Sequence, residues 1–180
     1  FASILNSFCE WFVGGKKYFY FLLNAVLKKL KINQFETYPK LIHAISPRCF
    51  ENQCGESEEF SFRGNDESGK TNSHVTRFLE SIGITNSSLF CVNQVHSDKV
   101  FILNDANITS NEVMKVSADA VVTHIPGKPI GVFSADCLPI LIYDPRLKVI
   151  GAVHAGRKGS EQGILLNVVR EMGRVYGSCP

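Results

Sequence analysis

Residues 149–176, VIGAVHAGRKGSEQGILLNVVREMGRVY, join a short apolar run to a longer amphipathic one. Val149 to Val153 is rich in β-branched residues, which predicts a buried strand. From Ser160 to Tyr176, apolar residues recur at the spacing of one helix face: Ile164, Leu165, Val168, Val169, Met172 and Val175. A strand that leads into a covering helix is typical of an α/β or α+β domain built in layers.

Short apolar runs separated by turn residues continue this pattern upstream, from residue 88 onward. The predicted strands are Leu89–Val95, Lys99–Leu103, Ala120–Thr123, Ile130–Phe133 and Pro139–Tyr143. Before them, Ser73 to Ile82 predicts a helix, because Gly83 follows it as a C-terminal capping residue should. Residues 45–75 are polar and predict loops, with a short strand at Phe60-Ser61-Phe62.

The first 35 residues differ in composition from the rest of the chain. They are aromatic and punctuated by lysines, and we interpret residues 1–35 as an N-terminal helical segment of unknown role. A domain over residues 40–180 follows it. The most apolar run of the first segment, Tyr18 to Leu27, is about half the length that a membrane span requires, so no membrane association is expected.

Composition excludes several classes of protein. Of the 180 residues, 44% are hydrophobic and 20% are charged, which is ordinary for a globular domain. The net charge of +2 is too small to indicate binding to nucleic acid. The six cysteines form no C-x-x-C pair, and a chain this long and apolar does not need disulfides. Reduced thiols, and with them a cytoplasmic location, are therefore expected.

Three residues with metal-binding side chains stand at the ends of predicted strands. His96 and His154 each end a strand, and Cys137 lies at a strand break. Such positions can converge at one edge of a sheet, and two imidazoles with a thiolate suit one zinc ion while leaving a fourth position open. The pattern alone also fits a buried thiol and two ordinary histidines.

Four blocks of sequence carry a family resemblance. They are NQVH (93–96), ADAVVT (118–123), GVFSADCLPILIYD (131–144) and GAVHAGRKG (151–159). In their order and spacing they resemble the signature blocks of the laccase-domain (YfiH-like) family, also called multicopper polyphenol oxidase or purine nucleoside phosphorylase proteins. The resemblance covers residues 85–180 and, more faintly, residues 43–84.

This resemblance implies a layered α/β sandwich with mixed sheets, and one zinc ion bound by His96, Cys137 and His154. It also implies phosphorolysis of adenosine, inosine or methylthioadenosine to free base and pentose 1-phosphate, with adenosine deamination beside it. Purine nucleosides and phosphate would be the partners, and a homo-oligomer is compatible with the sequence. Multicopper chemistry is not expected, because it requires many histidines, often in His-x-His pairs, and the chain has five and no such pair.

The chain departs from the family pattern in three places. Arg157 replaces the tryptophan that usually follows His-Ala-Gly, and an aromatic side chain there could stack on a base. Ser46-Pro47-Arg48 stands where the family has T-R-x-G-G-V-S. The family domain also continues beyond Pro180, so the C-terminal part of the domain is expected to be truncated.

Asp136 and Cys137 are the candidate catalytic residues. A zinc ion at Cys137 would position and activate an oxygen nucleophile, and Asp136 is the leading candidate for the acid or base beside it. An aspartate at a strand break also fixes turns through its own backbone, which is the competing interpretation. Asp119 has the same two interpretations and is the weaker candidate.

Basic residues in the predicted strand-to-helix turn indicate a phosphate contact. Arg157 and Lys158 lie where free backbone N–H groups and the helix dipole would favour an anion. Arg48 is a weaker third candidate, and a solvated basic turn is the alternative. Gln94 either orients a ligand or contacts substrate, or it makes an ordinary hydrogen bond at a strand end.

Two other functions fit the same residues. Cys137 with His96 or His154 could serve as nucleophile and base in a hydrolase or deamidase, since a thiolate and an imidazole are the required parts. Such an enzyme would work without zinc and would be inactivated by alkylation. The chain could also be a non-catalytic partial product that keeps only the metal site or a binding surface.

Overall fold

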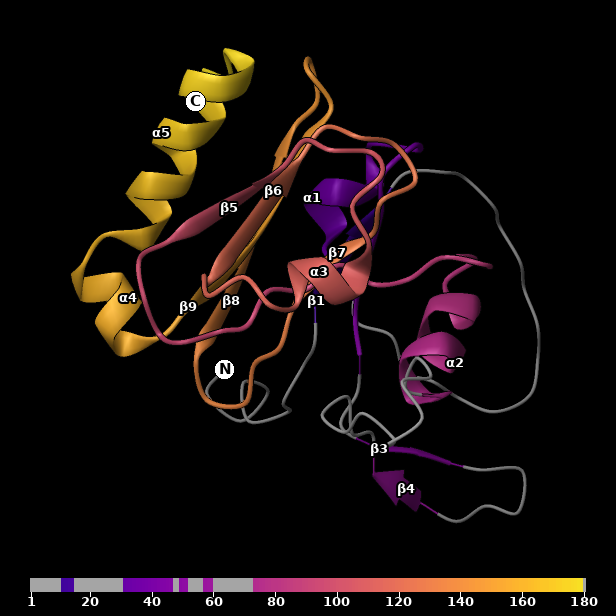
Figure 1. Ribbon diagram of the computed structural model, residues 1–180. Helices are drawn as coiled ribbons and strands as arrows, with labels where there is room; N and C mark the ends of the chain where they lie inside the picture. The colour runs from indigo at the N-terminus through magenta and orange to yellow at the C-terminus, as the bar shows by residue number, and fades with distance from the viewer. Residues whose placement is uncertain (1–10, 15–30, 47–48, 52–56, 60–72, 180) are drawn as a thin grey trace.

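The computed structural model describes residues 11–14, 31–46, 49–51, 57–59 and 73–179 (Figure 1). Within them the strands are β1 (Trp11–Gly14), β2 (Ile42–Ile45), β3 (Cys49–Glu51), β4 (Ser57–Glu59), β5 (Val100–Leu103), β6 (Ala120–Thr123), β7 (Ile130–Val132), β8 (Leu138–Asp144) and β9 (Val149–Ala155). The helices are α1 (Asn33–Glu36), α2 (Ser73–Ser81), α3 (Ser110–Val113), α4 (Arg157–Glu161) and α5 (Ile164–Tyr176).

A four-stranded mixed sheet in the order β5-β6-β9-β8 forms the centre of the fold. β5 and β6 run parallel, whereas β6 and β9, and β9 and β8, run antiparallel. A second, antiparallel sheet has the order β2-β1-β7, and β3 pairs with β4 separately. The expected α/β fold with mixed sheets is confirmed.

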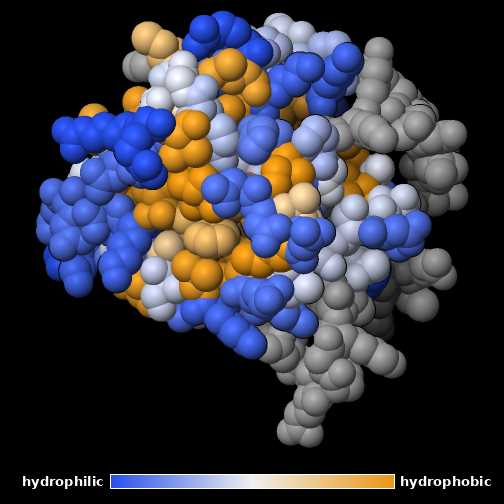
Figure 2. All heavy atoms as spheres, turned by 45° about the horizontal axis from the view of Figure 1, so that its top comes forward, coloured by the Kyte–Doolittle hydropathy of each residue, from blue (hydrophilic) through white to orange (hydrophobic). Residues whose placement is uncertain are grey.

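Successive side chains of the central strands enter two different cores, as the alternation of a strand requires. Val122 and Val153 share a core with Val168 of α5. Val121 instead shares a core with Ile130 of β7. Figure 1 shows α5 along one face of the central sheet, and Figure 2 shows hydrophobic residues in a band between hydrophilic ones. The helix, the central sheet and the second sheet are therefore the layers of a sandwich.

Strand β9 is the middle of this sandwich, because all seven of its residues are buried. Its neighbours are β6, where Ala120 lies opposite Val153, and β8, where Pro139 lies opposite His154. A strand buried on both faces is ordinarily a continuous apolar run. The histidine in VIGAVHA is thus a polar group inside the core, and burial of a polar group is costly unless it is hydrogen-bonded.

Most of the predicted elements are confirmed. The strands predicted from residue 99 onward are β5 to β9, with ends that shift by one or two residues. The helix predicted over Ser73–Ile82 is α2. Gly83 follows it with φ of 83°, and its N–H donates to the Glu80 carbonyl at 3.0 Å. This positive φ is the reason for a glycine at that position.

The strand predicted over Leu89–Val95 is wrong. Among the described residues, this segment makes two isolated bridges, one from Phe90 to Ile130 and one from Asn93 to Ser117. The backbone of Phe90 hydrogen-bonds to Pro129 and Gly131, at β7, whereas that of Asn93 hydrogen-bonds to Val116 and Ala118. The segment therefore forms no continuous ladder with one strand.

The single helix predicted over Ser160–Tyr176 is also wrong. It is two helices, α4 and α5, and α4 begins earlier, at Arg157. Gly163 separates them with φ of 81°, a left-handed conformation that ends the first helix and lets the second begin in a new direction.

The N-terminal segment contains a strand where the sequence predicts helix. Trp11 to Gly14 form β1, which lies between β2 and β7, because aromatic and β-branched residues favour strands. The division of the chain near residues 35–40 stays a prediction, and the strand predicted at residues 60–62 lies outside the described residues. Of the helices that are described, none has the length and apolar character needed to cross a membrane.

His43 makes the stability of this fold depend on pH. Its ring is buried, its Nε2 accepts a hydrogen bond from the Ile32 N–H at 2.9 Å, and Phe35 packs against it edge to face. Burial, and after it the charge of Lys31, holds the pKa of His43 below its ordinary value of 6.5. The unfolded chain therefore takes up a proton before the folded one does. The stability that His43 contributes is complete above about pH 6.5 and is lost as the pH falls.

Urea unfolding should give a free energy of unfolding that decreases from about pH 7.5 to about pH 5. His43→Gln keeps a hydrogen-bond acceptor but cannot titrate, so it should remove part of this decrease. An identical pH dependence in both proteins would show that His43 is not one of its sources.

Candidate metal centre

His96, Cys137 and His154 converge at one end of the central sheet. His154 lies in β9, Cys137 immediately precedes β8, and His96 lies in the segment that leads to β5. The register that sets Leu138 opposite Ala155 brings the start of β8 beside the end of β9. The three potential ligand atoms all lie within 4.8 Å of one another. The cluster that the sequence predicts is therefore present in the structure.

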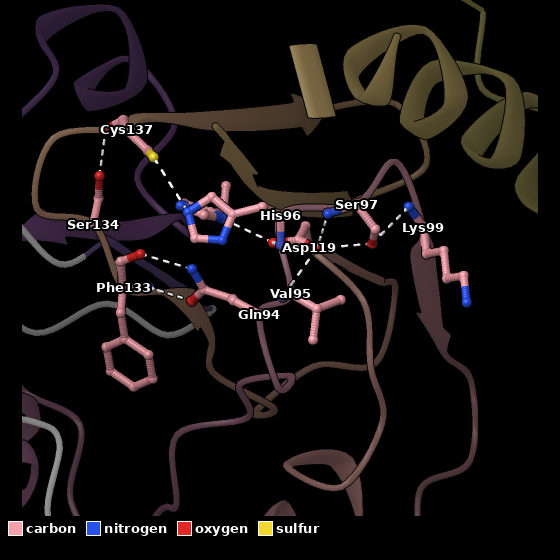
Figure 3. A network of polar contacts seen from close by, with 10 residues as sticks. Gln94, Val95, His96, Ser97, Lys99, Asp119, Phe133, Ser134 and Cys137 are labelled. Atoms are coloured by element: carbon pink, nitrogen blue, oxygen red, sulfur yellow. Dashed lines mark hydrogen bonds and ion pairs between the residues drawn. The ribbon is translucent and has the colours of Figure 1, made fainter. Parts of the chain in front are cut away.

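The three side chains face one another closely. The Cys137 Sγ is 3.8 Å from the His96 Nε2, a contact that Figure 3 marks with a dashed line. The rings of His96 and His154 meet edge to face, with centroids 4.8 Å apart. His154 is buried, Cys137 is half-buried and His96 is exposed. A ligand would thus reach this centre from the side of His96.

The donor set fits a zinc ion. Ligand atoms around a tetrahedral zinc, with bonds of about 2.0–2.3 Å, lie about 3.5 Å apart. The observed limit of 4.8 Å is about 1 Å wider than this spacing, so the three side chains would have to draw closer together to bind the ion. Two imidazole nitrogens and a sulfur are the borderline and soft donors that zinc prefers, and three protein donors leave one position for another ligand.

Gly156 closes the centre from behind. A Cβ at this position would lie 2.8 Å from the His96 Cδ2, 3.2 Å from the Cys137 Sγ and 3.6 Å from the His154 Cε1. A Cβ at Gly159 would lie 2.6 Å from the Ser97 carbonyl oxygen. The two glycines of His-Ala-Gly-x-x-Gly are thus needed because the backbone runs directly against the ligands and against the segment that carries one of them.

Asp119 directly precedes β6 and is fully buried. Its carboxylate accepts hydrogen bonds from three successive residues after Gln94. The backbone N–H groups of His96 and Ser97 donate to it at 2.9 and 2.6 Å, and that of Val95 at 3.3 Å. The Ser97 hydroxyl donates at 2.8 Å, and the His154 Nδ1 donates at 2.8 Å. Burial acts to raise the pKa of Asp119, but the hydrogen bonds from His154, Ser97 and His96 outweigh it and hold that pKa below its ordinary value.

His96 has an unusual backbone conformation. Its φ is 60°, in the left-handed region, which costs a residue with a side chain roughly 1–2 kcal/mol. The bonds from its own N–H and from that of Ser97 to Asp119 run through this turn (Figure 3). The Asp119 carboxylate therefore stabilises a conformation that His96 would not adopt by itself.

Gln94 uses both polar atoms of its amide on one backbone group. Its Nε2 donates to the Phe133 carbonyl at 2.8 Å, and its Oε1 accepts from the Phe133 N–H at 2.7 Å (Figure 3). These bonds tie the segment that carries His96 to the end of β7. A direct contact of Gln94 with substrate stays a prediction.

The other predicted site residues lie at the exposed rim. Asp136 is exposed in the turn before β8, a turn in which the Ser134 hydroxyl donates to the Cys137 carbonyl. Arg157 and Lys158 are exposed at the start of α4, directly after Gly156. Arg48 lies outside the described residues. The structure therefore unites the three predicted metal ligands and leaves the predicted catalytic and phosphate-binding side chains accessible around them.

From the sequence, the structural role of Asp119 is underestimated and Ser97 is not identified. The carboxylate of Asp119 is not an exposed acid or base, because burial and five hydrogen bonds occupy it. A signal for this is present in ADAVVT: one charged residue at the head of an apolar strand requires partners wherever that strand is buried.

Residues 44–180 match the protein family described as multi-copper polyphenol oxidoreductase laccase. A purine nucleoside phosphorylase of Streptomyces coelicolor is 35% identical over 117 residues, which are 64% of this chain and 47% of that protein. Adenosine deaminase RL5, from an unknown prokaryotic organism, is 33% identical over 97 residues, which are 52% of this chain and 37% of that protein. The chain thus spans less than half the length of either relative.

A solved structure shares the fold. The protein YfiH of Bacillus licheniformis superposes with a TM-score of 0.62 over 86% of this chain and 60% of its own, at 21% identity. The layered arrangement that the four sequence blocks imply is confirmed by this likeness.

The closeness of Gly156 to all three ligands yields a test of the centre. Gly156→Ala should displace His96 or Cys137, because a Cβ 2.8 Å from the imidazole cannot be accommodated without movement. We expect zinc affinity to fall roughly tenfold or more, as for other losses of ligand orientation, measured by competition with a chromophoric chelator.

Gly151→Ala is the matched control, because it adds the same methyl group within β9, the strand that ends directly before Gly156. There the nearest atoms are 3.6 Å away, in Ile142 and Val122, which is ordinary contact. Equal zinc affinity in the Gly156→Ala protein and in this control would mean that the three side chains do not bind the metal together.

Proposed function

We propose that this chain, which belongs to the multi-copper polyphenol oxidoreductase laccase family, is a zinc-dependent enzyme that acts on purine nucleosides. The observation that carries the proposal is the cluster of His96, Cys137 and His154 in a chain whose relatives are named purine nucleoside phosphorylase and adenosine deaminase. The reactions are phosphorolysis of adenosine, inosine or methylthioadenosine to free base and pentose 1-phosphate, and deamination of adenosine. Since the chain spans less than half of each relative, its substrates belong to the proposal.

One zinc ion would be held by the Nε2 atoms of His96 and His154 and the Sγ of Cys137. Magnesium and calcium prefer oxygen donors, which are not the donors of this cluster. Zinc with three protein ligands acts as a Lewis acid toward an oxygen atom in its fourth position. Multicopper chemistry is not proposed, because the whole chain has five histidines and no His-x-His pair.

Asp136 is the residue proposed to exchange protons with a substrate. It is exposed, it adjoins Cys137, and its carboxylate makes no hydrogen bond to another described residue. In deamination, its carboxylate would take a proton from the attacking water and deliver it to the departing amine nitrogen. Asp119 cannot do this, since it is buried and its oxygens already accept bonds.

Arg157 and Lys158 are the proposed phosphate contacts. Both are exposed directly after Gly156, the residue that touches the ligand cluster. The planar guanidinium of Arg157 can bind phosphate with two parallel hydrogen bonds, and Lys158 adds a second positive charge. These residues would hold the phosphate oxygen that attacks the ribose carbon as the glycosidic bond breaks. Arg48 remains a weaker proposal for the same role.

The surroundings of this activity are also proposed. Cys137 and Cys179 are free thiols in the described part of the chain, which supports a reducing, cytoplasmic location. The catalytic unit would be the domain over residues 40–180, and a homo-oligomer is compatible with it.

A second candidate function is a thiol hydrolase or deamidase. The observation that favours it is the contact of 3.8 Å between the Cys137 Sγ and the His96 Nε2, the pair that a thiolate nucleophile and its base would form. Such an enzyme would retain activity after chelation and lose it on alkylation of Cys137. The zinc enzyme would lose activity on chelation.

The first experiment is chromatography of adenosine after incubation with the protein, with and without phosphate. We expect adenine only when phosphate is present, or inosine in both cases. Cys137→Ala should lose either product, because it removes a metal ligand, whereas Cys91→Ala, at a buried thiol away from the cluster, should retain it. A zinc-loaded, folded wild type that forms neither product would contradict the proposal.

The role of Asp136 has its own test. Asp136→Asn keeps the shape of the side chain but cannot carry the proton, so turnover should fall by roughly 10²–10⁴-fold while bound zinc is unchanged. Asp105→Asn, at an exposed turn that bonds the Asn107 N–H, serves as the control. Unchanged turnover in the Asp136→Asn protein would assign Asp136 to the turn alone.

A further inference from the structure

We infer that Asp119 is a positioning residue that orients both histidines of the cluster already in the metal-free protein. It selects the nitrogen of His154 that binds the metal, and it fixes the backbone conformation of His96. The inference rests on the proposed metal centre and adds to it a fourth residue, which does not touch the metal.

Asp119 determines the tautomer of His154. A carboxylate only accepts hydrogen bonds, so the contact of 2.8 Å between the Asp119 Oδ1 and the His154 Nδ1 requires a proton on Nδ1. The proton of the neutral ring is then used, and the lone pair of Nε2 is free toward the cluster. His154 is buried, and so is the Asp119 carboxylate that its Nδ1 contacts. A metal-binding histidine whose other nitrogen bonds to a carboxylate is oriented in this way.

Asp119 also holds the backbone of His96, whose side chain is exposed. Its left-handed φ of 60° is held because its own N–H and that of Ser97 both donate to Asp119. The Ser97 hydroxyl donates to the Asp119 Oδ2, the atom that also accepts from the Ser97 N–H, and it accepts from the Lys99 N–H at 3.3 Å. The Asp119 carboxylate therefore fixes the backbone that carries the exposed imidazole of His96.

Asp119 is itself fixed by two backbone hydrogen bonds. Its backbone N–H donates to the Lys99 carbonyl at 3.0 Å, and its carbonyl accepts from the His154 N–H at 2.8 Å. The residue is thus joined by backbone to both segments whose histidines its side chain holds. Movement of either histidine relative to the other would have to break bonds to Asp119.

The test combines a readout that needs no metal with one that does. In metal-free wild type, long-range ¹H–¹⁵N NMR of the imidazoles should show His154 protonated at Nδ1 and bare at Nε2. In Asp119→Asn, which can donate as well as accept, the ring should become a mixture of tautomers. The affinity for Co²⁺ should fall by about 10–100-fold, with a changed visible absorption spectrum.

Thr123→Val is the control for simple loss of stability. Thr123 lies on the same strand, is buried, and donates to the Leu103 carbonyl at 2.7 Å, but it bonds to none of the cluster. It should lower the melting temperature and leave the tautomer and the Co²⁺ affinity unchanged. If Asp119→Asn does not fold, Ser97→Ala, which removes one donor to Asp119, should still weaken Co²⁺ binding relative to the control.

Three results would overturn the inference: a bare Nδ1 in the wild type, Co²⁺ affinity in Asp119→Asn equal to that of the wild type, or equal losses in Ser97→Ala and Thr123→Val. A wild type that binds no Co²⁺ but shows the expected tautomer would instead remove the proposed metal centre and leave the role of Asp119 in placing the histidines. The two failures are therefore distinguishable.

Discussion

The buried carboxylate of Asp119 is the constraint on which the rest of the structure depends. A buried charge without partners would be strongly unfavourable, and removal of one partner of a buried pair typically costs about 3–5 kcal/mol. Here every partner comes from the two segments that carry the histidines of the cluster. Burial of Asp119 is therefore coupled to the placement of His96 and His154 beside each other.

The same constraint explains why small residues surround the cluster. His154 occupies a strand buried on both faces, and it is tolerated there because its Nδ1 has a carboxylate partner. The chain then has to leave the sheet within two residues, and Gly156 permits this because it has no side chain to press against the ligands. Gly159 does the same against the Ser97 carbonyl. Close packing around the centre, and not a flexible loop, determines the local sequence.

Much of this could be predicted from the sequence, and the exceptions have physical causes. Strands such as Ala120–Thr123 are visible because burial on both faces leaves an apolar run between turn residues. Leu89–Val95 is equally apolar, yet its backbone bonds are divided between β7 and the region of Ser117, a tertiary choice that local sequence does not contain. The strand at Trp11–Gly14 likewise depends on pairing with β2 and β7, which are far away in the sequence. The break between α4 and α5, in contrast, falls at Gly163, whose left-handed φ is a local feature.

For the centre, residue types together with the family resemblance pointed to His96, Cys137 and His154, but not to what holds them. The role of Asp119 depends on its depth and on the direction of five donors, and neither follows from spacing.

Exposure divides the centre into two halves with different requirements. Asp119 and His154 are buried, and with the glycine turn they form the half that positions a metal. His96, Asp136, Arg157 and Lys158 are exposed, and they form the half that would meet a substrate. The hydrogen bonds of the buried half come from β9 and from the segment that carries His96, and they are all made between residues of the core scaffold. The residues proposed to bind a metal are therefore positioned by the fold itself, whereas the residues proposed to contact a substrate are not constrained by the core. Arg157 belongs to the exposed half, so the departure from the family pattern expected at this position does not alter the buried residues that hold His96 and His154.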